Sequence, residues 1–205
     1  MFITLEGMDG SGKTTQFRKL AEWLTAQGCS VLTVREPGGT QLGESVREIL
    51  LQGRGSVMDA RAELLLFCAS RAQLVAERIL PHLEQGGVVL CDRFADSTLA
   101  YQGYGRGLDL DLLRTILDFA TCGRWPDLTL YFDLDVETAL ARRAADGEVN
   151  RLDSESVEFH RRVQAGYEQL AACDPRRWVT VDARQPIEVV EAAVVRAVES
   201  RMGSD

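Results

Sequence analysis

The stretch Gly7-Met8-Asp9-Gly10-Ser11-Gly12-Lys13-Thr14 fits the pattern G-x-x-x-x-G-K-[ST] of a phosphate-binding P-loop. Such a loop points successive backbone N–H groups at phosphate oxygens, which requires backbone conformations that glycine adopts most readily. Lys13 would supply a positive charge for the β- and γ-phosphates, and the Thr14 hydroxyl would ligate Mg²⁺. The predicted nucleotide-binding residues are Gly7, Asp9, Gly10, Ser11, Gly12, Lys13, Thr14 and Thr15.

The sequence on both sides of this loop supports the assignment. Residues 2–5 are a short apolar and β-branched run, which predicts a strand. After the loop, apolar residues from Phe17 to Leu24 recur at helical spacing, and Gly28 ends the predicted helix. A strand, a P-loop and a helix in this order favour a true nucleotide site over an ordinary glycine-rich turn.

The length and the charge of the chain restrict its class. A chain of 205 residues suits one domain, 1–205, with a small lid. The net charge of −8 disfavours nucleic acid as a partner. Because Lys13 and Lys19 are the only lysines, arginines must make the other phosphate contacts, for which their planar fork is suited.

Targeting and membrane signals are absent from the sequence. The first predicted strand starts at Phe2, with no basic and apolar leader before it, and no apolar run is as long as a membrane span. The five cysteines are scattered and include no C-x-x-C pair, so we expect reduced thiols and no zinc site. These features predict a cytoplasmic protein without membrane contact.

The remaining apolar runs predict an α/β protein. Strands are expected at 30–35, 87–92, 128–134 and 178–181, and helices at 42–51, 59–85, 110–121, 139–144, 154–172 and from Pro186 onward. Alternation of strands and helices predicts a five-stranded parallel sheet flanked by helices on both faces.

A carboxylate ends the strand predicted at 87–92. Asp92 has the position of a Walker B aspartate, so Thr14 and Asp92 are the predicted Mg²⁺ residues. Arg93 follows directly. Residues 94–106 are polar and aromatic, which predicts a flexible segment suited to contact a small ligand.

The helix predicted at 59–85 has two faces of interest. Its expected core stripe is Ala62, Leu65, Leu66, Ala69, Ala76, Ile79, Leu80 and Leu83. Phe67 and Arg71 lie on another face, four residues apart, and would meet on one surface. Taken alone, Phe67 is equally well a core residue and Arg71 a solvated charge.

Two loops carry further candidates. Residues 36–40 follow a strand end, where ligands bind in open α/β sheets, although the loop is also a simple connection. Residues 142–151 contain Arg142, Arg143 and Arg151 with a glycine and several acids, which indicates a mobile lid or a plain solvated loop.

Three classes of function fit these residues. The first is a kinase that acts on another small anion, such as a nucleoside monophosphate. The second is a kinase of another nucleotide or of a nucleoside, for which Glu36 would be the acid near a 5′-hydroxyl. The third is a nucleotide-dependent binding protein, which the arginines around the pocket argue against because they need an anion. A GTPase is disfavoured, since no N-K-x-D segment is present.

Nearly the whole chain resembles the bacterial thymidylate kinases. The matching segments are 6–15 (EGMDGSGKTT), 35–40 (REPGGT), 67–71 (FCASR), 92–94 (DRF), 101–106 (YQGYGR) and 150–153 (NRLD). This resemblance implies a P-loop nucleoside monophosphate kinase fold with a lid at about 142–153, ATP and Mg²⁺ as cofactors, and a homodimer. It implies transfer of the γ-phosphoryl group of ATP to dTMP, giving dTDP and ADP.

The resemblance also implies roles for individual residues. The implied dTMP site consists of Asp9, Arg35, Glu36, Pro37, Arg47, Phe67, Arg71, Arg93, Ser97, Thr98, Tyr101 and Gln102. In it Phe67 would stack on thymine and Arg71 would hydrogen-bond the base, while Asp9 would contact the 3′-hydroxyl. The implied catalytic residues are Lys13, Asp92, Arg93, Arg143 and Arg151. Some relatives carry an arginine at the position of Gly10; this chain does not, so the lid would supply that charge.

Overall fold

The computed structural model describes residues 1–52, 58–145 and 150–203. The strands are β1 Phe2–Gly7, β2 Val31–Arg35, β3 Val88–Asp92, β4 Leu128–Asp133 and β5 Trp178–Asp182. The α-helices are α1 Lys13–Ala26, α2 Gln41–Gln52, α3 Ala60–Leu74, α4 Leu80–Glu84, α5 Ala95–Thr98, α6 Leu110–Thr121, α7 Val136–Ala145, α8 Val157–Cys173 and α9 Ile187–Met202. Two π-helical segments, η1 Val75–Ile79 and η2 Leu99–Gly105, continue α3 and α5.

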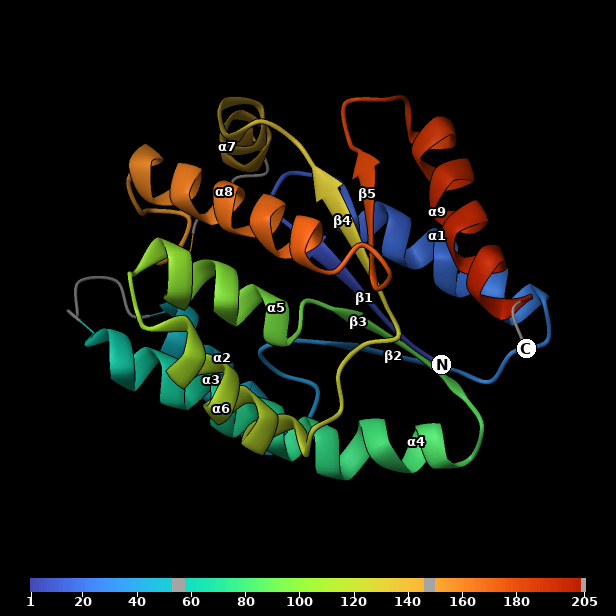
Figure 1. The fold of residues 1–205 in the computed structure, drawn as a ribbon, viewed down its shortest axis with the longest axis horizontal. Helices are drawn as coiled ribbons and strands as arrows, with labels where there is room; N and C mark the ends of the chain where they lie inside the picture. Colours follow the sequence, from blue (N-terminus) through green and yellow to red (C-terminus); the bar gives the residue numbers. More distant parts are fainter. Residues whose placement is uncertain (53–57, 146–149, 204–205) are drawn as a thin grey trace.

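The five strands form one parallel sheet in the order β2-β3-β1-β4-β5. β1 lies in the centre, and the chain passes from β1 to β2 and β3 on one side and to β4 and β5 on the other (Figure 1). The P-loop therefore starts at the point where the strand order reverses, which is where open α/β sheets bind ligands. The predicted five-stranded α/β fold is confirmed.

Helices cover both faces of the sheet and create two apolar cores (Figure 1). α1, α7 and α9 bury their apolar stripes on one face, and α3, α6, α8 and the two π-helical segments bury theirs on the other. Side chains of β1 alternate between them: Ile3 and Leu5 belong to the first core and Phe2 to the second. The same alternation turns Glu6 towards the second face, under α5 and α8.

The helix predicted at 59–85 is present, but its predicted core stripe is wrong in its first half. Ala62, Leu65, Ala69 and Ala76 are exposed, with 59% of Leu65 accessible, and Leu66 is only half-buried. The buried face instead carries Glu63, Leu64, Cys68, Ser70 and Arg71. Periodicity favoured the wholly apolar stripe, because it could not show that Glu63 and Arg71 find partners on distant segments.

The segment 94–106 also differs from the prediction of a flexible loop. Residues 95–105 of it are helical, as α5 and η2, and the side chains of Leu99, Tyr101 and Gln102 are buried. Its polar groups are buried because Arg71, Glu63 and Arg93 supply hydrogen-bond partners. The segment is thus a rigid wall of the site.

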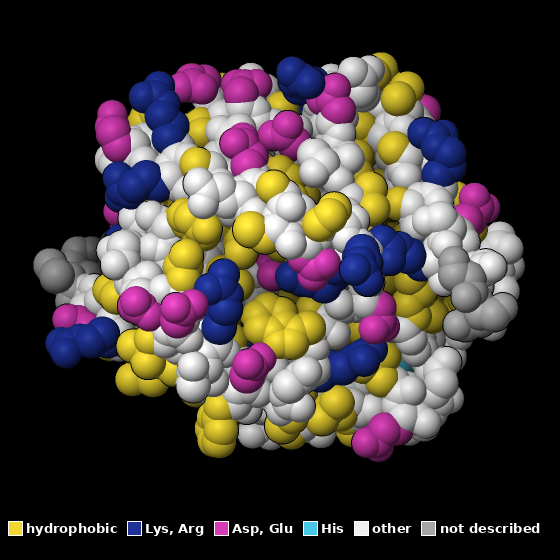
Figure 2. Space-filling model, in the orientation of Figure 1, with side chains coloured by type: hydrophobic (Ala, Val, Ile, Leu, Met, Phe, Trp, Pro, Cys, Tyr) yellow, Lys and Arg dark blue, Asp and Glu magenta, His cyan; other side chains and the backbone are white. Residues whose placement is uncertain are grey.

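No described helix is long and apolar enough to cross a membrane. On the face seen in Figure 2, basic and acidic side chains are interspersed.

Candidate active site

The P-loop lies directly against α7. Gly10 has a φ of +83°, and a Cβ atom added there would lie 2.3 Å from the carbonyl oxygen of Ala139 and 3.2 Å from the backbone nitrogen of Arg143. A side chain at position 10 would therefore clash with the backbone of α7. This packing explains why an arginine is not accommodated at Gly10 and brings the turn that carries Arg143 onto the loop.

The Lys13 side chain is folded back onto the P-loop. Its Nζ donates hydrogen bonds to the carbonyl oxygens of Gly7 at 2.9 Å and Met8 at 2.8 Å, and it lies 3.8 Å from Oδ1 of Asp9. Burial, together with the nearby Arg93, lowers the pKa of Lys13 to about 8. Lys13 is thus mostly protonated at neutral pH. A bound anion would offset the cost of burying its positive charge.

A cavity opens above the loop, which we call the P-loop cavity. Its lining includes all predicted nucleotide-binding residues except Gly7, together with Arg142, Arg143, Gln185, Pro186 and Ile187. Backbone N–H groups at the start of α1 point to this side of the loop. The cavity therefore combines an anion site with an apolar wall from the start of α9.

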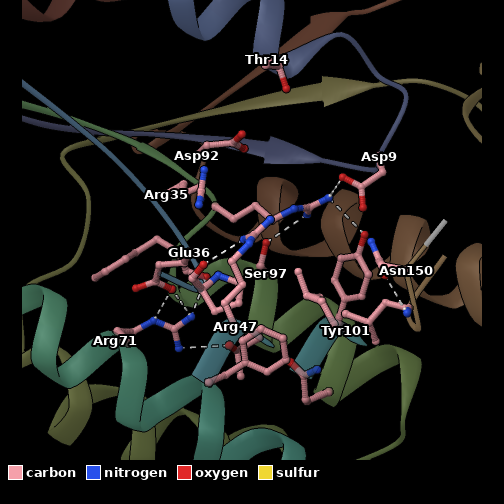
Figure 3. Close-up of a pocket in the computed structure, with 18 of the residues that line it drawn as sticks. Asp9, Thr14, Arg35, Glu36, Arg47, Arg71, Asp92, Ser97, Tyr101 and Asn150 are labelled. Carbon is pink, nitrogen blue, oxygen red and sulfur yellow. Dashed lines mark hydrogen bonds and ion pairs between the residues drawn. The ribbon is translucent and has the colours of Figure 1, made fainter. Parts of the chain in front are cut away.

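A second cavity, which we call the arginine cavity, lies beside the first (Figure 3). All residues of the implied dTMP site line it: Asp9, Arg35, Glu36, Pro37, Arg47, Phe67, Arg71, Arg93, Ser97, Thr98, Tyr101 and Gln102. The structure thus gathers residues from the P-loop, the loop after β2, α2, α3, and the segment after β3. Leu51, Phe94, Asn150 and Leu152 also line this cavity. None of the four was a predicted site residue, although Phe94, Asn150 and Leu152 lie in the segments 92–94 and 150–153.

Arg93 lies at the centre of a hydrogen-bond network. Its guanidinium donates to Oδ1 of Asp9 at 2.8 Å, to Oγ of Ser97 at 3.2 Å and to the hydroxyl oxygen of Tyr167 at 3.2 Å. Arg93 has a φ of +65°, which is uncommon for a residue with a side chain and indicates a constrained position. Burial alone would raise the pKa of Asp9, but the nearby Arg93 and Lys13 hold this pKa well below its usual range.

A buried carboxylate supports this network from below. Glu6 accepts hydrogen bonds from the backbone nitrogen of Phe94 at 2.7 Å, from Ser97 Oγ at 2.6 Å and from the Tyr167 hydroxyl at 2.9 Å. Burial and the nearby Asp96 raise the pKa of Glu6 to about 7, despite the opposing effect of Arg93. Glu6 thus orients two groups that in turn hold the Arg93 guanidinium.

Arg71 is almost fully buried, so it is not a solvated charge. Its Nη2 and Nε lie 2.5 and 2.8 Å from Oε2 of Glu36, and its Nη1 donates to Thr98 Oγ1 at 3.0 Å. Nη2 also donates to the carbonyl oxygen of Phe94 at 3.1 Å. Four of the five guanidinium N–H groups thus have partners on distant segments, and one on Nη1 is left for a ligand. Oε1 of Glu36 is buried and has no partner among the described residues.

Arg35 and Arg47, which also line the arginine cavity, are less enclosed than Arg71. Arg35 is exposed and forms an ion pair with Glu44 at 3.1 Å, and Arg47 donates to the carbonyl oxygen of Pro37 at 2.9 Å. Together with Arg93 they place three positive groups at one end of the cavity, suited to an anion. The half-buried ring of Phe67 lies in the same lining, and its face is a surface for a planar group.

The two cavities share four residues, Asp9, Thr14, Asp92 and Arg143. Asp92 and Thr14 therefore meet the same space from β3 and from α1, as the sequence predicted (Figure 3). Oδ1 of Asp92 is buried and unpaired within the described part of the chain. A carboxylate and a hydroxyl oxygen beside a phosphate site fit the ligand preference of Mg²⁺.

The candidate lid arginines lie in different surroundings. Arg143 lines both cavities, and its Nε donates to Oδ2 of Asp153 at 3.0 Å. Arg151 instead donates to the carboxylate of Glu63 and to the carbonyl oxygen of Leu50. Arg151 is absent from the lining of either cavity. The part of the predicted lid at 146–149 lies outside the described residues.

The chain matches one family model, described as thymidylate kinase, over residues 5–194. The chain belongs to the thymidylate kinase family. A thymidylate kinase of Thermomicrobium roseum is 55% identical, covering 94% of this chain and 91% of that protein. One of Roseiflexus castenholzii is 49% identical, covering 100% and 95%. The crystal structure of thymidylate kinase from Ehrlichia chaffeensis superposes with a TM-score of 0.78 at 37% identity, over 97% of this chain and 98% of that one.

The activity follows from this membership. The enzyme transfers the γ-phosphoryl group of ATP to dTMP, a step in dTTP synthesis. Of the classes left open by the sequence, the nucleoside kinase and the nucleotide-dependent binding protein are thereby excluded.

Several contributors to this kinase site were missed by sequence reasoning. Tyr167 lies on α8, and its helical spacing gave no sign that its hydroxyl reaches Arg93. Glu6 did carry a signal, since it is the single charged residue of an otherwise apolar strand. Gln185, Pro186 and Ile187 enter the P-loop cavity only because β5 ends beside β4.

Proposed function

We propose that ATP binds in the P-loop cavity and dTMP in the arginine cavity, with the reacting phosphates between Asp9, Thr14, Asp92 and Arg143. The observation that carries this proposal is that these four residues line both cavities. A donor phosphate held by the P-loop would then meet an acceptor phosphate held by Arg35, Arg47 and Arg93. Thymine would lie deeper, between Phe67 and the buried groups of Arg71, Thr98 and Gln102.

Catalysis in this arrangement needs no strong general base. The attacking oxygen belongs to a phosphate that is already anionic, so positioning and electrostatic stabilisation are sufficient. Lys13 would hold the β- and γ-phosphates from the donor side, and Arg93 the acceptor phosphate. Arg143 would stabilise charge on the transferred group, because it alone of the candidate lid arginines lines both cavities. The lid, residues 142–153, would exclude water as a competing acceptor.

Asp92 and Thr14 would hold the magnesium ion. The unpaired Oδ1 of Asp92 and the exposed Thr14 support this assignment. Mg²⁺ there would neutralise part of the charge on the β- and γ-phosphates.

A panel of acceptors tests the placement of dTMP. We expect kcat/KM to be highest for dTMP and about tenfold lower for dUMP, which lacks one methyl group in the pocket. We expect dCMP, dAMP and dGMP to fall about 10²-fold or more, because their base edges leave buried polar groups unpaired. Thymidine is expected to be inert, since the site has no assigned base for a 5′-hydroxyl.

The measurement is ATP consumption with each acceptor at matched concentrations. A preference for any base other than thymine or uracil contradicts the placement of Arg71 and Gln102 at the base. Turnover of thymidine comparable to that of dTMP contradicts the assignment of the three arginines to the acceptor phosphate.

We further propose that the enzyme is a homodimer through the exposed face of α2, α3 and α6. Each helix exposes apolar residues on one side at helical spacing: Leu42 and Ile49, Ala62, Leu65 and Ala69, and Leu112 and Phe119. α3 packs against both α2 and α6, and Figure 2 shows hydrophobic side chains over α6 at the lower left. Large apolar side chains gathered in this way are typical of protein interfaces.

Analytical sedimentation measures the mass of the assembly in solution. We expect a species of twice the 22.7 kDa chain mass, and we expect Phe119→Asp combined with Leu65→Glu to convert it to a monomer. Val189→Glu is the matched control, because Val189 is also an exposed apolar residue but lies on α9, which covers the opposite face of the sheet. A wild-type monomer at micromolar concentration, or a dimer that persists in the double variant, contradicts the proposed interface.

We also place the enzyme in the cytoplasm. The supporting observations are that its substrates are ATP and dTMP and that all five cysteines are unpaired, as expected in a reducing compartment.

A further inference from the structure

Glu63 is a buried carboxylate beside the arginine cavity that the proposed mechanism does not use. It lies in the first turn of α3 and is fully inaccessible to solvent. Its Oε1 accepts a hydrogen bond from Nε2 of Gln102 at 2.8 Å and from Nε of Arg106 at 3.0 Å. Its Oε2 accepts from Nη2 of Arg106 at 3.0 Å and from Arg151. A buried carboxylate with four donors is well satisfied and firmly positioned.

These donors also keep Glu63 ionised. Burial alone would raise the pKa of Glu63, but hydrogen bonds from Arg106, Gln102 and Arg151 outweigh this effect and lower that pKa. Arg106 is itself held by Glu155 at 2.7 Å and lies over the ring of Phe159 at 5.0 Å. The negative charge at Glu63 is therefore a permanent feature of this wall of the cavity.

An ionised carboxylate determines the orientation of the Gln102 side-chain amide. It has only acceptor atoms, so the amide atom 2.8 Å away must be the nitrogen, and the carbonyl oxygen must be turned elsewhere. Gln102 lines the arginine cavity, and no described residue donates to its Oε1. The Gln102 oxygen is therefore an acceptor left available at the cavity wall, while one N–H of the same amide is held by Glu63.

We propose that Glu63 is a specificity-determining positioning residue that acts through Gln102, selecting pyrimidines with an N–H donor on the ring edge over those with an acceptor there. Thymine and uracil carry N–H at N3, whereas N3 of cytosine is an acceptor. N3 of cytosine would instead lie against the Gln102 oxygen, so two acceptors would face each other with no hydrogen bond between them. In a buried site, two unpaired acceptors lower the binding affinity. This proposal rests on the proposed placement of the base beside Gln102.

The Glu63→Gln variant tests the proposal. A glutamine at position 63 presents both a donor and an acceptor, so the Gln102 amide becomes free to adopt either orientation. We expect the ratio of kcat/KM for dTMP to that for dCMP to fall at least tenfold, mainly through the two KM values, with KM for ATP within about twofold of wild type. Glu63→Asp keeps a carboxylate and is expected to retain the ratio.

Glu155→Gln is the matched control. It removes the other carboxylate partner of Arg106 but does not contact Gln102, so the ratio should stay at the wild-type value. If the dTMP/dCMP ratio falls equally in Glu63→Gln and Glu155→Gln, the loss comes from a less firmly held Arg106 side chain and not from Gln102. The proposal would then be wrong.

A double-mutant cycle separates this proposal from the placement of the base. Gln102→Leu alone should lower the ratio, and Glu63→Gln should then have no further effect, because its only route to the base is gone. An unchanged ratio in Gln102→Leu contradicts the placement of the base. If the dTMP/dCMP ratio falls in Gln102→Leu but is unchanged in Glu63→Gln, the proposed role of Glu63 is overturned and the placement of the base is not. If Glu63→Gln does not fold, loss of the ratio in folded Glu63→Asp overturns the proposal.

Discussion

Arg143→Ala is expected to lower kcat about 10³-fold with little change in either KM, since arginines that stabilise a transferring phosphoryl group contribute about 10³–10⁵ in kcat. The reason is its position: Arg143 lines both cavities, and its backbone lies against Gly10 of the P-loop. Its guanidinium is held towards the site by Asp153. Steady-state kinetics with ATP and dTMP each varied will separate the effect on kcat from the effects on KM.

Two other lid arginines provide the controls for this prediction. Arg151→Ala should reduce kcat at least tenfold less than Arg143→Ala, because the Arg151 side chain is occupied by Glu63 and Leu50. Arg142 lines only the P-loop cavity, so Arg142→Ala should act mainly on KM for ATP. An unchanged kcat in Arg143→Ala would contradict the assignment, and a larger loss in Arg151→Ala would transfer the role to that residue.

Arg71→Ala is expected to have the largest effect on stability, together with loss of dTMP binding. The substitution leaves the carboxylate of Glu36 buried without its only described partner, and breaking a buried ion pair in this way costs about 3–5 kcal/mol of unfolding free energy. ATP affinity should be spared, because neither Glu36 nor Thr98 lines the P-loop cavity. Urea unfolding and calorimetric titration with each nucleotide measure the two effects.

The stability deficit of this variant should depend on pH. Burial already raises the pKa of Glu36 against the opposing effect of Arg71, and removal of Arg71 raises it further. A carboxyl group whose pKa is higher in the folded than in the unfolded state stabilises the fold while it is protonated and loses that contribution as pH rises. The deficit of Arg71→Ala should therefore be largest above neutral pH and shrink as pH falls towards the pKa of an unfolded glutamate.

A second substitution distinguishes the structural effect from the functional one. Arg71→Met combined with Glu36→Leu removes both charges and should recover most of the lost stability, because apolar residues of similar volume replace buried ion pairs at little cost. It should not recover dTMP binding. Equal loss of dTMP and ATP affinity in a folded Arg71→Ala variant would contradict a role at the base.

Most of the fold was predictable from the sequence because its signals are local. The five strands are short apolar runs bounded by turn residues, and most of the longer helices show apolar residues at helical spacing, so no knowledge of the partner elements was needed to locate them. Cavity residues at strand ends, such as Asp92 and Arg93, could be placed because strand ends of a parallel sheet meet at one edge. The roles of Arg47 on α2 and of Phe67 and Arg71 on α3 were implied by the family resemblance.

The failures concern side chains whose partners are distant in the sequence. Hydrophobicity predicted that Leu65 is buried and left Glu63 unassigned, yet Leu65 is exposed and Glu63 is buried. Glu63 is stable there because Gln102, Arg106 and Arg151 converge on it from two other segments. Likewise the segment 94–106 is ordered because its polar groups meet Arg71, Glu63 and Glu6, which no local pattern reveals.

The sequence by itself determined the P-loop and the parallel sheet around it, because both depend on residue type and on spacing along the chain. The need for a positive charge that Gly10 does not supply was implied by the resemblance to the family. Only the tertiary structure decided that Arg143 faces the space between the two cavities and that Arg151 is held by Glu63. The physical reason is that both arginines carry the same charge on neighbouring segments, and their partners come from other parts of the chain.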